Sequence, residues 1–258
     1  MIIFTHIPKT AGTTLKSILR NNFGIYHVDS IKVKKPVYTA DDLRFAKRVF
    51  FKVKAITGHN LVNPHANLQV EGAQLITMLR DPVTRCASHY QYLVQQVNLK
   101  LSFEEWIKQE KNQNAMVKVI SGSNDLQYAK ELLKHHYHFV GISERFQDSL
   151  KLLNIILNEP LDLQYRSLIK ARSNETKKRL MEDEASLNLL KKHNQLDQQL
   201  YEFAMEDIFL PMVEKYSQEM KSIIIPAERK GRRKTFRISS SIRYNKFVYR
   251  QLIKLFRR

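Results

Sequence analysis

The alternation of apolar and polar positions along the chain predicts a sheet covered by helices. Short apolar runs of strand length begin at Ile2, Ala55 and Gln74, and each is followed by a loop or a tight turn. Segments with three- and four-residue apolar periodicity lie between and after them, several with capping residues at their start. The expected helices are 40–49 after the cap Thr39, one opened by Ser102 and Glu105, 125–134, 144–157, 174–192, and 194–220 with a kink or break at Pro211.

The first strand leads into a loop and a helix start that can bind an anion. From Ile7 to Leu15 the sequence is Ile-Pro-Lys-Thr-Ala-Gly-Thr-Thr-Leu, with Lys9 ahead of Gly12. Backbone N–H groups at a helix N-terminus point at a ligand, and the helix dipole favours negative charge there. Lys9 adds a positive charge, and the threonines add hydroxyl donors. A Walker A loop places its lysine directly after its second glycine, so this is a different loop. An ordinary strand-turn-helix with an exposed lysine is the alternative.

A second strand, turn and helix places an arginine where the strand ends. The run 74–79 is followed by Arg80-Asp81-Pro82, in which Asp81 suits an N-cap and Pro82 the first helical position. In open α/β sheets ligands bind at the carboxyl ends of the strands, where Arg80 is expected. Taken alone, this turn is equally consistent with a capped helix start. Together, the two segments suit a ligand with two separate anionic groups.

These two segments resemble the nucleotide-binding motifs of sulfotransferases that use 3′-phosphoadenylyl sulfate (PAPS), in particular the branch of the heparan sulfate 2-O- and 6-O-sulfotransferases. The resemblance continues in order to about residue 216, through 114–122, 139–150 and 194–209. It implies a P-loop-like, three-layer α/β fold in which a central, mainly parallel sheet is flanked by helices, with many helical insertions. It assigns the 5′-phosphosulfate to Lys9, Thr10, Ala11, Gly12, Thr13 and Thr14, and the 3′-phosphate to Arg80 and Ser88.

The resemblance also places a catalytic histidine at the Gly-His that ends the strand begun at Ala55. An imidazole titrates near ~6.5, and we expect nearby Lys9 to lower the pKa of His59 and enlarge its neutral fraction. His59 then accepts the proton of a hydroxyl, and Lys9 stabilises charge on the leaving phosphate oxygen. The implied acceptor is a hydroxyl on a carbohydrate or related metabolite. The 2-O and 6-O specificities are not carried over, because His6 and Pro8 depart from the two patterns.

A nucleotide kinase is a competing interpretation of the two anion sites. Kinases hold Mg²⁺ against the phosphates with carboxylates. The first loop contains no acidic residue, and Asp81 is explained as a helix cap. The sequence therefore favours sulfuryl transfer from PAPS, with 3′-phosphoadenosine 5′-phosphate (PAP) as the product and without a metal.

The composition agrees with a soluble enzyme. The chain has 258 residues, of which 43% are hydrophobic, enough for one substantial core. The single cysteine, Cys86, excludes an intramolecular disulfide and is expected to be a buried, small apolar residue. The chain begins directly on its first strand, and no apolar run is long enough to span a bilayer, so we expect a cytoplasmic protein.

Positive charge is concentrated at the C-terminus. Residues 226–258 carry +11 of the net charge of +18. We expect a sulfotransferase domain over 1–225, then a basic linker and an amphipathic helix over 226–258. The helix of 242–258 either docks on its own domain or contacts an anionic membrane or polyanion, which leaves a membrane-peripheral location open.

A nucleic-acid- or polyanion-binding protein without catalysis is the rival function. It does not explain the two anion sites, so no specific nucleic acid is expected.

Overall fold

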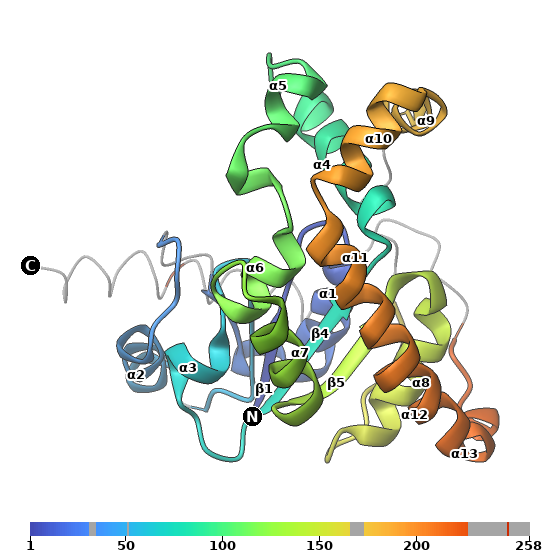
Figure 1. Cartoon of the computed structure of the whole chain (residues 1–258). Coiled ribbons are helices and arrows are strands. Elements are labelled where there is room, and N and C mark those ends of the chain that lie inside the picture. Colours follow the sequence, from blue (N-terminus) through green and yellow to red (C-terminus); the bar gives the residue numbers. More distant parts are fainter. Residues whose placement is uncertain (31–34, 51, 166–172, 227–246, 248–258) are drawn as a thin grey trace, which may run out of the picture.

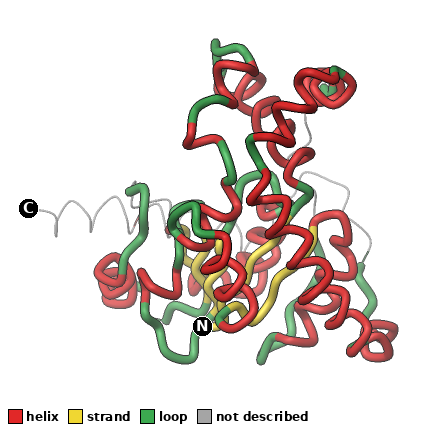
Figure 2. The backbone as a smooth tube through the Cα atoms, viewed as in Figure 1, coloured by secondary structure: helices red, strands yellow, loops and turns green. Residues whose placement is uncertain are grey.

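The computed structural model describes residues 1–30, 35–50, 52–165, 173–226 and 247. The centre of this part of the chain is a five-stranded sheet with the order β2-β3-β1-β4-β5, in which every pairing is parallel. The strands are β1 (Ile2–Thr5), β2 (His27–Asp29), β3 (Ala55–Gly58), β4 (Gln74–Leu79) and β5 (Tyr137–Ile142). Figure 2 shows the strands in yellow among the surrounding helices. The predicted fold, a parallel sheet flanked by helices, is confirmed.

Helices make up most of the remaining described chain and include insertions between the strands. The α-helices are α1 (Gly12–Phe23), α2 (Ala40–Val49), α3 (Pro64–Leu68), α4 (Pro82–Val97), α5 (Phe103–Ile107), α6 (Ala115–Ser121), α7 (Leu126–His135), α8 (Phe146–Ile156), α9 (Glu175–Glu182), α10 (Glu184–Lys192), α11 (Gln195–Phe203), α12 (Leu210–Lys215) and α13 (Ser217–Ser222). Short 3₁₀ turns are η1 (Gly24–Tyr26), η3 (Glu110–Asn112) and η4 (Ser143–Arg145), and η5 (Ala204–Phe209) is a π-helical segment.

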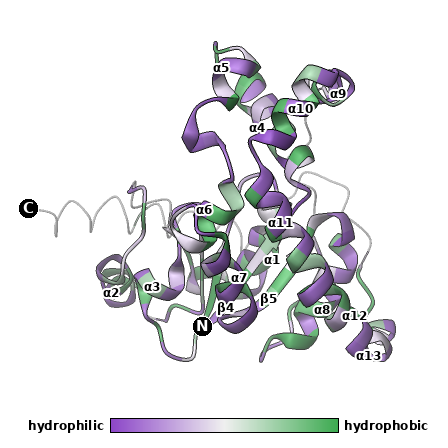
Figure 3. Cartoon of the chain, in the orientation of Figure 1, coloured by the Kyte–Doolittle hydropathy of each residue, from purple (hydrophilic) through white to green (hydrophobic). Residues whose placement is uncertain are grey.

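Two apolar clusters hold these elements together. The larger one contains the inner residues of the sheet and of the helices around it, and Figure 3 shows the hydrophobic colour on β4 and β5. Because helices cover both faces, all four residues of β1 and all six of β4 are buried. The smaller cluster joins α4, α5, α9 and α10, which project together at the top of Figure 1. It includes Cys86, which is fully buried, as predicted.

The predicted helix starts are confirmed, whereas two predicted long helices are divided. Thr39 and Ser102 both form capping boxes. The segment 174–192 is two helices, because the backbone at Asp183 is extended and its carboxylate accepts a hydrogen bond from Ser186 N at 2.8 Å, which starts α10. The segment 194–220 changes to a π-helical turn just before Pro211, which lacks the N–H of a regular turn. It then breaks at Tyr216.

The basic C-terminal segment is largely outside the described residues. The predicted linker and the helix of 242–258 fall within 227–246 and 248–258, so the division near residue 225 and the role of this helix stay predictions. Among the helices of the described residues, none combines the length and the apolar character needed to cross a bilayer.

Candidate active site

Three neighbouring strands bring the predicted site residues to one edge of the sheet. β3, β1 and β4 are adjacent and in register, with Thr5 opposite both Gly58 and Thr77. Residues 6–11, which we name the Lys9 loop, follow β1 and lead into α1. The ring Nδ1 of His59 lies 2.6 Å from the backbone oxygen of His6, and Arg80 Nη1 donates to the backbone oxygen of Lys9 at 3.0 Å. Both flanking segments therefore contact the Lys9 loop directly.

The Lys9 loop has an unusual backbone that leaves the start of α1 open. Lys9 and Ala11 both have left-handed conformations, with φ of 70° and 58°. Such conformations cost of order 1–3 kcal/mol in a non-glycine residue and cluster at functional sites. Ala11 occupies the N-cap position, and no side chain of the described residues caps α1. The N–H group of Thr14 donates to the carbonyl of Ala11 at 3.0 Å, whereas those of Gly12 and Thr13 have no intrahelical acceptor and are available to an anion.

The predicted hydroxyl donors of this loop differ in their surroundings. Thr10 is fully buried, and its hydroxyl donates to the backbone oxygen of Ile7 at 2.9 Å. This hydroxyl proton is therefore used to fold the loop rather than offered to a ligand. Thr13 and Thr14 lie in the first turn of α1, where their side chains are partly exposed.

Gly12 is required by the ring of His6, which packs directly on the start of α1. A Cβ at Gly12 would overlap the His6 ring. That ring is 5% exposed, stacks on Phe4 with centroids 5.4 Å apart, and lies 4.1 Å from the ring of His59. Burial, followed by the charges of His59 and Lys16, lowers the pKa of His6 well below its ordinary value. His6 is thus a neutral packing residue between the start of α1 and His59.

Replacement of Gly12 by alanine is expected to disturb this contact. The added methyl group must displace the His6 ring or the helix start, at about 1–3 kcal/mol for an overpacked position. Thermal unfolding should show this loss for Gly12→Ala. The variant Gly72→Ala is a control for steric overlap. No atom lies within 4 Å of its added Cβ, and only the positive φ of 66° disfavours alanine there. Combining Gly12→Ala with His6→Ala should restore stability, and failure to do so would contradict the packing argument.

His59 is held as one tautomer by its contact with the Lys9 loop. The carbonyl of His6 can only accept, so Nδ1 of His59 carries the proton and Nε2 is the unprotonated nitrogen of the neutral ring. The pKa of His59 is lowered, chiefly by burial and then by Lys16, against the opposing effects of the His6 carbonyl and Asp29. The predicted direction is confirmed. The predicted cause, Lys9, was wrong, since burial and Lys16 account for the decrease.

Arg80 lies between the Lys9 loop and a carboxylate that was not predicted as a site residue. Its Nε is 3.6 Å from Oε1 of Glu144, which also accepts from the backbone N–H of Asp81 at 3.3 Å. The other oxygen of Glu144 accepts from the hydroxyl of Tyr201 at 3.2 Å. Burial lowers the pKa of Arg80, while Glu144 and Asp81 act in the opposite direction. These contacts fix the guanidinium at the carboxyl end of β4.

The start of α4 agrees with the sequence prediction. Asp81 is the N-cap, accepting from Thr84 N at 2.7 Å, and Pro82 is the first helical residue. Ser88 lies about two turns into the helix, with a partly exposed side chain. The helix therefore begins beside Arg80 and carries Ser88 along its length.

Two further residues of α4 face the site and were missed from the sequence. The Nζ of Lys9 lies 5.0 Å from the centre of the Tyr92 ring. Burial, then the charges of Arg85, Lys9 and His59, lowers the pKa of His89 to about 4, so His89 is neutral at physiological pH. A signal was available, because residues 88, 89 and 92 are spaced to share one helix face.

Comparison with known proteins agrees with this arrangement. The sequence profile described as "Sulfotransferase family" matches residues 1–204. The chain belongs to the sulfotransferase family. It is also similar to heparan sulfate 2-O-sulfotransferase 1 of Mus musculus and Homo sapiens (22% identity each) and of Gallus gallus (23%), over 249 aligned positions that cover 80% of this chain and 70% of each relative.

The residues of this sulfotransferase fit an anionic nucleotide. The uncapped start of α1, the left-handed Lys9 loop and the guanidinium of Arg80 converge at one sheet edge. Within the described ranges, no three His, Cys, Asp or Glu side chains are grouped so that they could hold a metal ion. Lys9 and Arg80 bring positive charge to the same sheet edge as the open start of α1.

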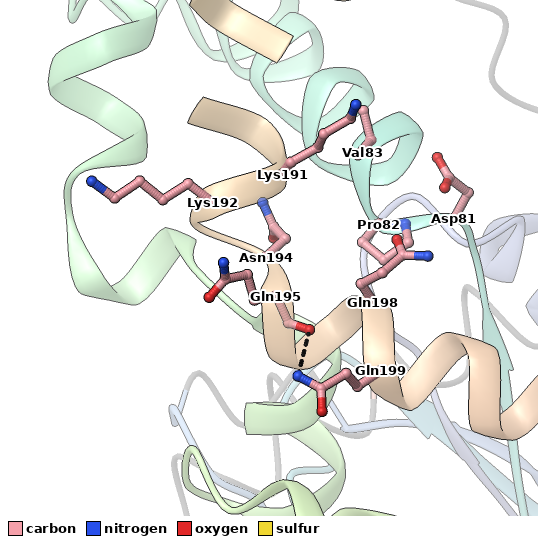
Figure 4. Close-up of a pocket in the computed structure, with 9 residues that line it drawn as sticks. All are labelled: Asp81, Pro82, Val83, Lys191, Lys192, Asn194, Gln195, Gln198 and Gln199. Carbon is pink, nitrogen blue, oxygen red and sulfur yellow. Dashed lines mark hydrogen bonds between the residues drawn. The ribbon is translucent and has the colours of Figure 1, made fainter. Parts of the chain in front are cut away.

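A groove of about 840 Å³ adjoins the turn that carries Arg80 (Figure 4). It lies between the start of α4 and the turn from α10 to α11 of the sulfotransferase. Its lining is mainly carboxamide and lysine side chains, namely Asp81, Pro82, Val83, Lys191, Lys192, Asn194, Gln195, Gln198 and Gln199. The Lys9 loop does not contribute to this lining, so the groove is a neighbour of the candidate anion site and is distinct from it.

Proposed function

We propose that this sulfotransferase transfers a sulfuryl group from PAPS to a hydroxyl of a carbohydrate or a related metabolite. The observation that carries the proposal is the hydrogen bond from Arg80 to the Lys9 carbonyl, which joins two anion-binding segments beside His59. The family match supports the reaction class, and the similarity to enzymes named for heparan sulfate supports a sugar acceptor.

The donor binds through its two anionic ends. Lys9, Ala11, Gly12, Thr13 and Thr14 hold the 5′-phosphosulfate with backbone N–H groups, two hydroxyls and one ammonium group, and the buried Thr10 shapes the loop. Arg80 and Ser88 hold the 3′-phosphate. Charge-assisted hydrogen bonds to phosphate are stronger than neutral ones, so the 3′-phosphate distinguishes PAPS from ordinary adenine nucleotides.

Bound PAPS supplies the activated sulfuryl group. His59 accepts a proton, and Lys9 stabilises negative charge. His59 accepts the acceptor hydroxyl proton at Nε2, because its Nδ1 proton is held by the His6 carbonyl. Lys9 stabilises the negative charge that develops on the leaving phosphate oxygen. The new oxygen–sulfur bond forms as the bond between sulfur and the phosphate oxygen breaks, and PAP is released. No metal is needed, since Lys9, Arg80 and the α1 terminus supply positive charge.

The rival function, binding of a polyanion without catalysis, is disfavoured. It accounts for the net charge of +18 but not for a family match over residues 1–204. Contact between residues 242–258 and an anionic membrane or polyanion remains a separate proposal that rests on the charge of that segment. A cytoplasmic location is also a separate proposal, and the single cysteine is consistent with it.

Calorimetric titration of the full chain with PAP, AMP and ADP tests the donor site. PAP and AMP differ only in the 3′-phosphate, and we expect PAP to bind about tenfold to a hundredfold more tightly because of Arg80. Arg80→Ala should remove this preference. Arg44→Ala is the matched control, because Arg44 is 65% exposed on α2 and pairs only with Asp41 among the described residues.

Equal binding of PAP and ADP by the unmodified chain would overturn the proposal, since ADP also carries two phosphates. Radiolabelled PAPS with a panel of saccharides then tests transfer itself. A chain that binds PAP selectively but labels only non-carbohydrate hydroxyls would keep the donor and refute the acceptor class.

A further inference from the structure

The ammonium group of Lys9 rests on an aromatic ring. Its Nζ lies 5.0 Å from the centre of the Tyr92 ring, within the range of a cation–π contact. Tyr92 projects from α4, four residues after Ser88, with 37% of its surface exposed. The contact therefore links the predicted 5′-phosphosulfate loop to the helix that carries the predicted 3′-phosphate serine.

Lys9 has little other compensation for its charge. Across the described ranges, no carboxylate lies within 4.0 Å of its Nζ. Burial and the nearby guanidinium of Arg80 both disfavour the charged form and lower the pKa of Lys9. The negative face of an aromatic ring opposes these two effects, and it does so more strongly where water is excluded.

The groups around Lys9 leave Arg80 as its main charged neighbour. Arg80 comes from the end of β4 and is itself paired with Glu144 at 3.6 Å. His89 of α4 lies nearby, and burial lowers its pKa to about 4, so it adds no charge at neutral pH. Within the described part of the chain, the Tyr92 ring is thus placed to favour the protonated form of Lys9.

We propose that Tyr92 is a positioning residue, whose ring face holds the ammonium group of Lys9 charged and beside α4. The inference rests on the proposed function only in giving Lys9 a role in sulfuryl transfer. The ring is the active part, and the hydroxyl is dispensable. Because Tyr92 is exposed and lies outside both apolar clusters, its replacement should leave the fold intact.

Tyr92→Leu and Tyr92→Phe separate the ring from the hydroxyl. The pKa of Lys9 is measured by NMR on chain labelled with ¹³C at lysine Cε, with Lys9→Arg assigning the signal. Tyr92→Leu should lower this pKa by about 0.5 to 1.5. It should also lower kcat/KM for PAPS by about threefold to thirtyfold. Since Lys9 acts when protonated, a lower pKa moves the alkaline fall of the pH profile to lower pH. Tyr92→Phe should match the unmodified enzyme in all three.

A second cation–π pair provides the control. The Nζ of Lys215 lies 4.9 Å from the ring of Tyr216, which follows α12, and Tyr216→Leu should change none of the measurements on Lys9. An unchanged Lys9 pKa and pH profile in Tyr92→Leu would overturn the proposal, as would equal losses in the Phe and Leu variants. The NMR titration needs no turnover. If the unmodified chain transfers no sulfuryl group, the proposed function fails. The NMR titration still shows whether the Tyr92 ring raises the pKa of Lys9.

Discussion

Replacing His59 by alanine is expected to lower kcat for sulfuryl transfer by about 10²- to 10⁴-fold, the usual contribution of a positioned general base. The ring is oriented for this role because its Nδ1 is bound to the His6 carbonyl at 2.6 Å, which leaves Nε2 to accept the proton. PAP affinity should change little, since donor binding is assigned to the Lys9 loop, Arg80 and Ser88. Steady-state kinetics with PAPS and a saccharide acceptor, together with PAP titration, measure both.

The pH profile gives the same prediction a second test. A histidine base works only when unprotonated, so activity rises as pH increases through its pKa. Burial lowers the pKa of His59, so the acid limb should have its midpoint below the ordinary value of about 6.5. His59→Ala should remove this limb.

His138 provides a matched control for this prediction, because it is exposed on β5. His138→Ala should keep both the rate and the limb. Near-normal turnover in His59→Ala would remove His59 from the role of base.

The apolar runs were sufficient to place the strands that carry the site. β1, β3 and β4 are buried on both faces, and such strands are visible as short apolar segments in the sequence. Their carboxyl ends meet at one edge in any parallel sheet, so Lys9, His59 and Arg80 could be expected to gather there. The sequence also showed a glycine in this segment, Gly12. Only the structure shows why it is glycine, because a side chain there would overlap the His6 ring.

The edge strand β2 was not predictable from the same pattern. Its three residues include His27 and Asp29, both buried but polar. Their partners come from elsewhere in the chain. His27 Nε2 lies 3.0 Å from the hydroxyl of Thr57, and Asp29 accepts from Lys16 at 2.7 Å and Arg20 at 2.6 Å. Only the folded chain shows that these polar residues are compensated and can form a strand.

The charge interactions within the site also could not be predicted from the sequence. A linear pattern does not show that Lys16 rather than Lys9 acts on His59, nor that Glu144 reaches Arg80. The same holds for Tyr92, which the sequence shows only as part of a helix. These contacts join segments that lie far apart along the chain, and they decide which groups are charged.

Replacing Asp197 by alanine is expected to lower the free energy of unfolding by about 3–5 kcal/mol, the cost of leaving a buried charge without its partner. Asp197 is 0% exposed and accepts hydrogen bonds from the backbone N–H groups of Met116 at 3.1 Å and Val117 at 2.9 Å. It also lies 3.8 Å from Nη2 of Arg85, which is 1% exposed. Burial raises the pKa of Asp197, while Arg85 and the two N–H donors act against burial.

Asp197→Ala should lower the free energy of unfolding strongly, because the Arg85 guanidinium has few other hydrogen-bond partners. Its Nε and Nη1 have no hydrogen-bond partner among the described residues, and its Nη2 reaches Asn194 only at 3.5 Å. Urea unfolding of Asp197→Ala measures the effect. Asp183→Ala serves as the control, since it removes an exposed helix cap and should cost only about 1 kcal/mol.

A double replacement separates the charge from the packing. Arg85→Met with Asp197→Leu removes both charges at similar volume, and it should be more stable than Asp197→Ala alone, because no unpaired ion remains. Arg85 lies one turn before Ser88 and His89 on α4, so Asp197→Ala should also weaken PAP binding by displacing that helix face. If Asp197→Ala costs less than about 1 kcal/mol, or if the double replacement is no more stable, the buried ion pair is not what holds α4 against α6 and α11.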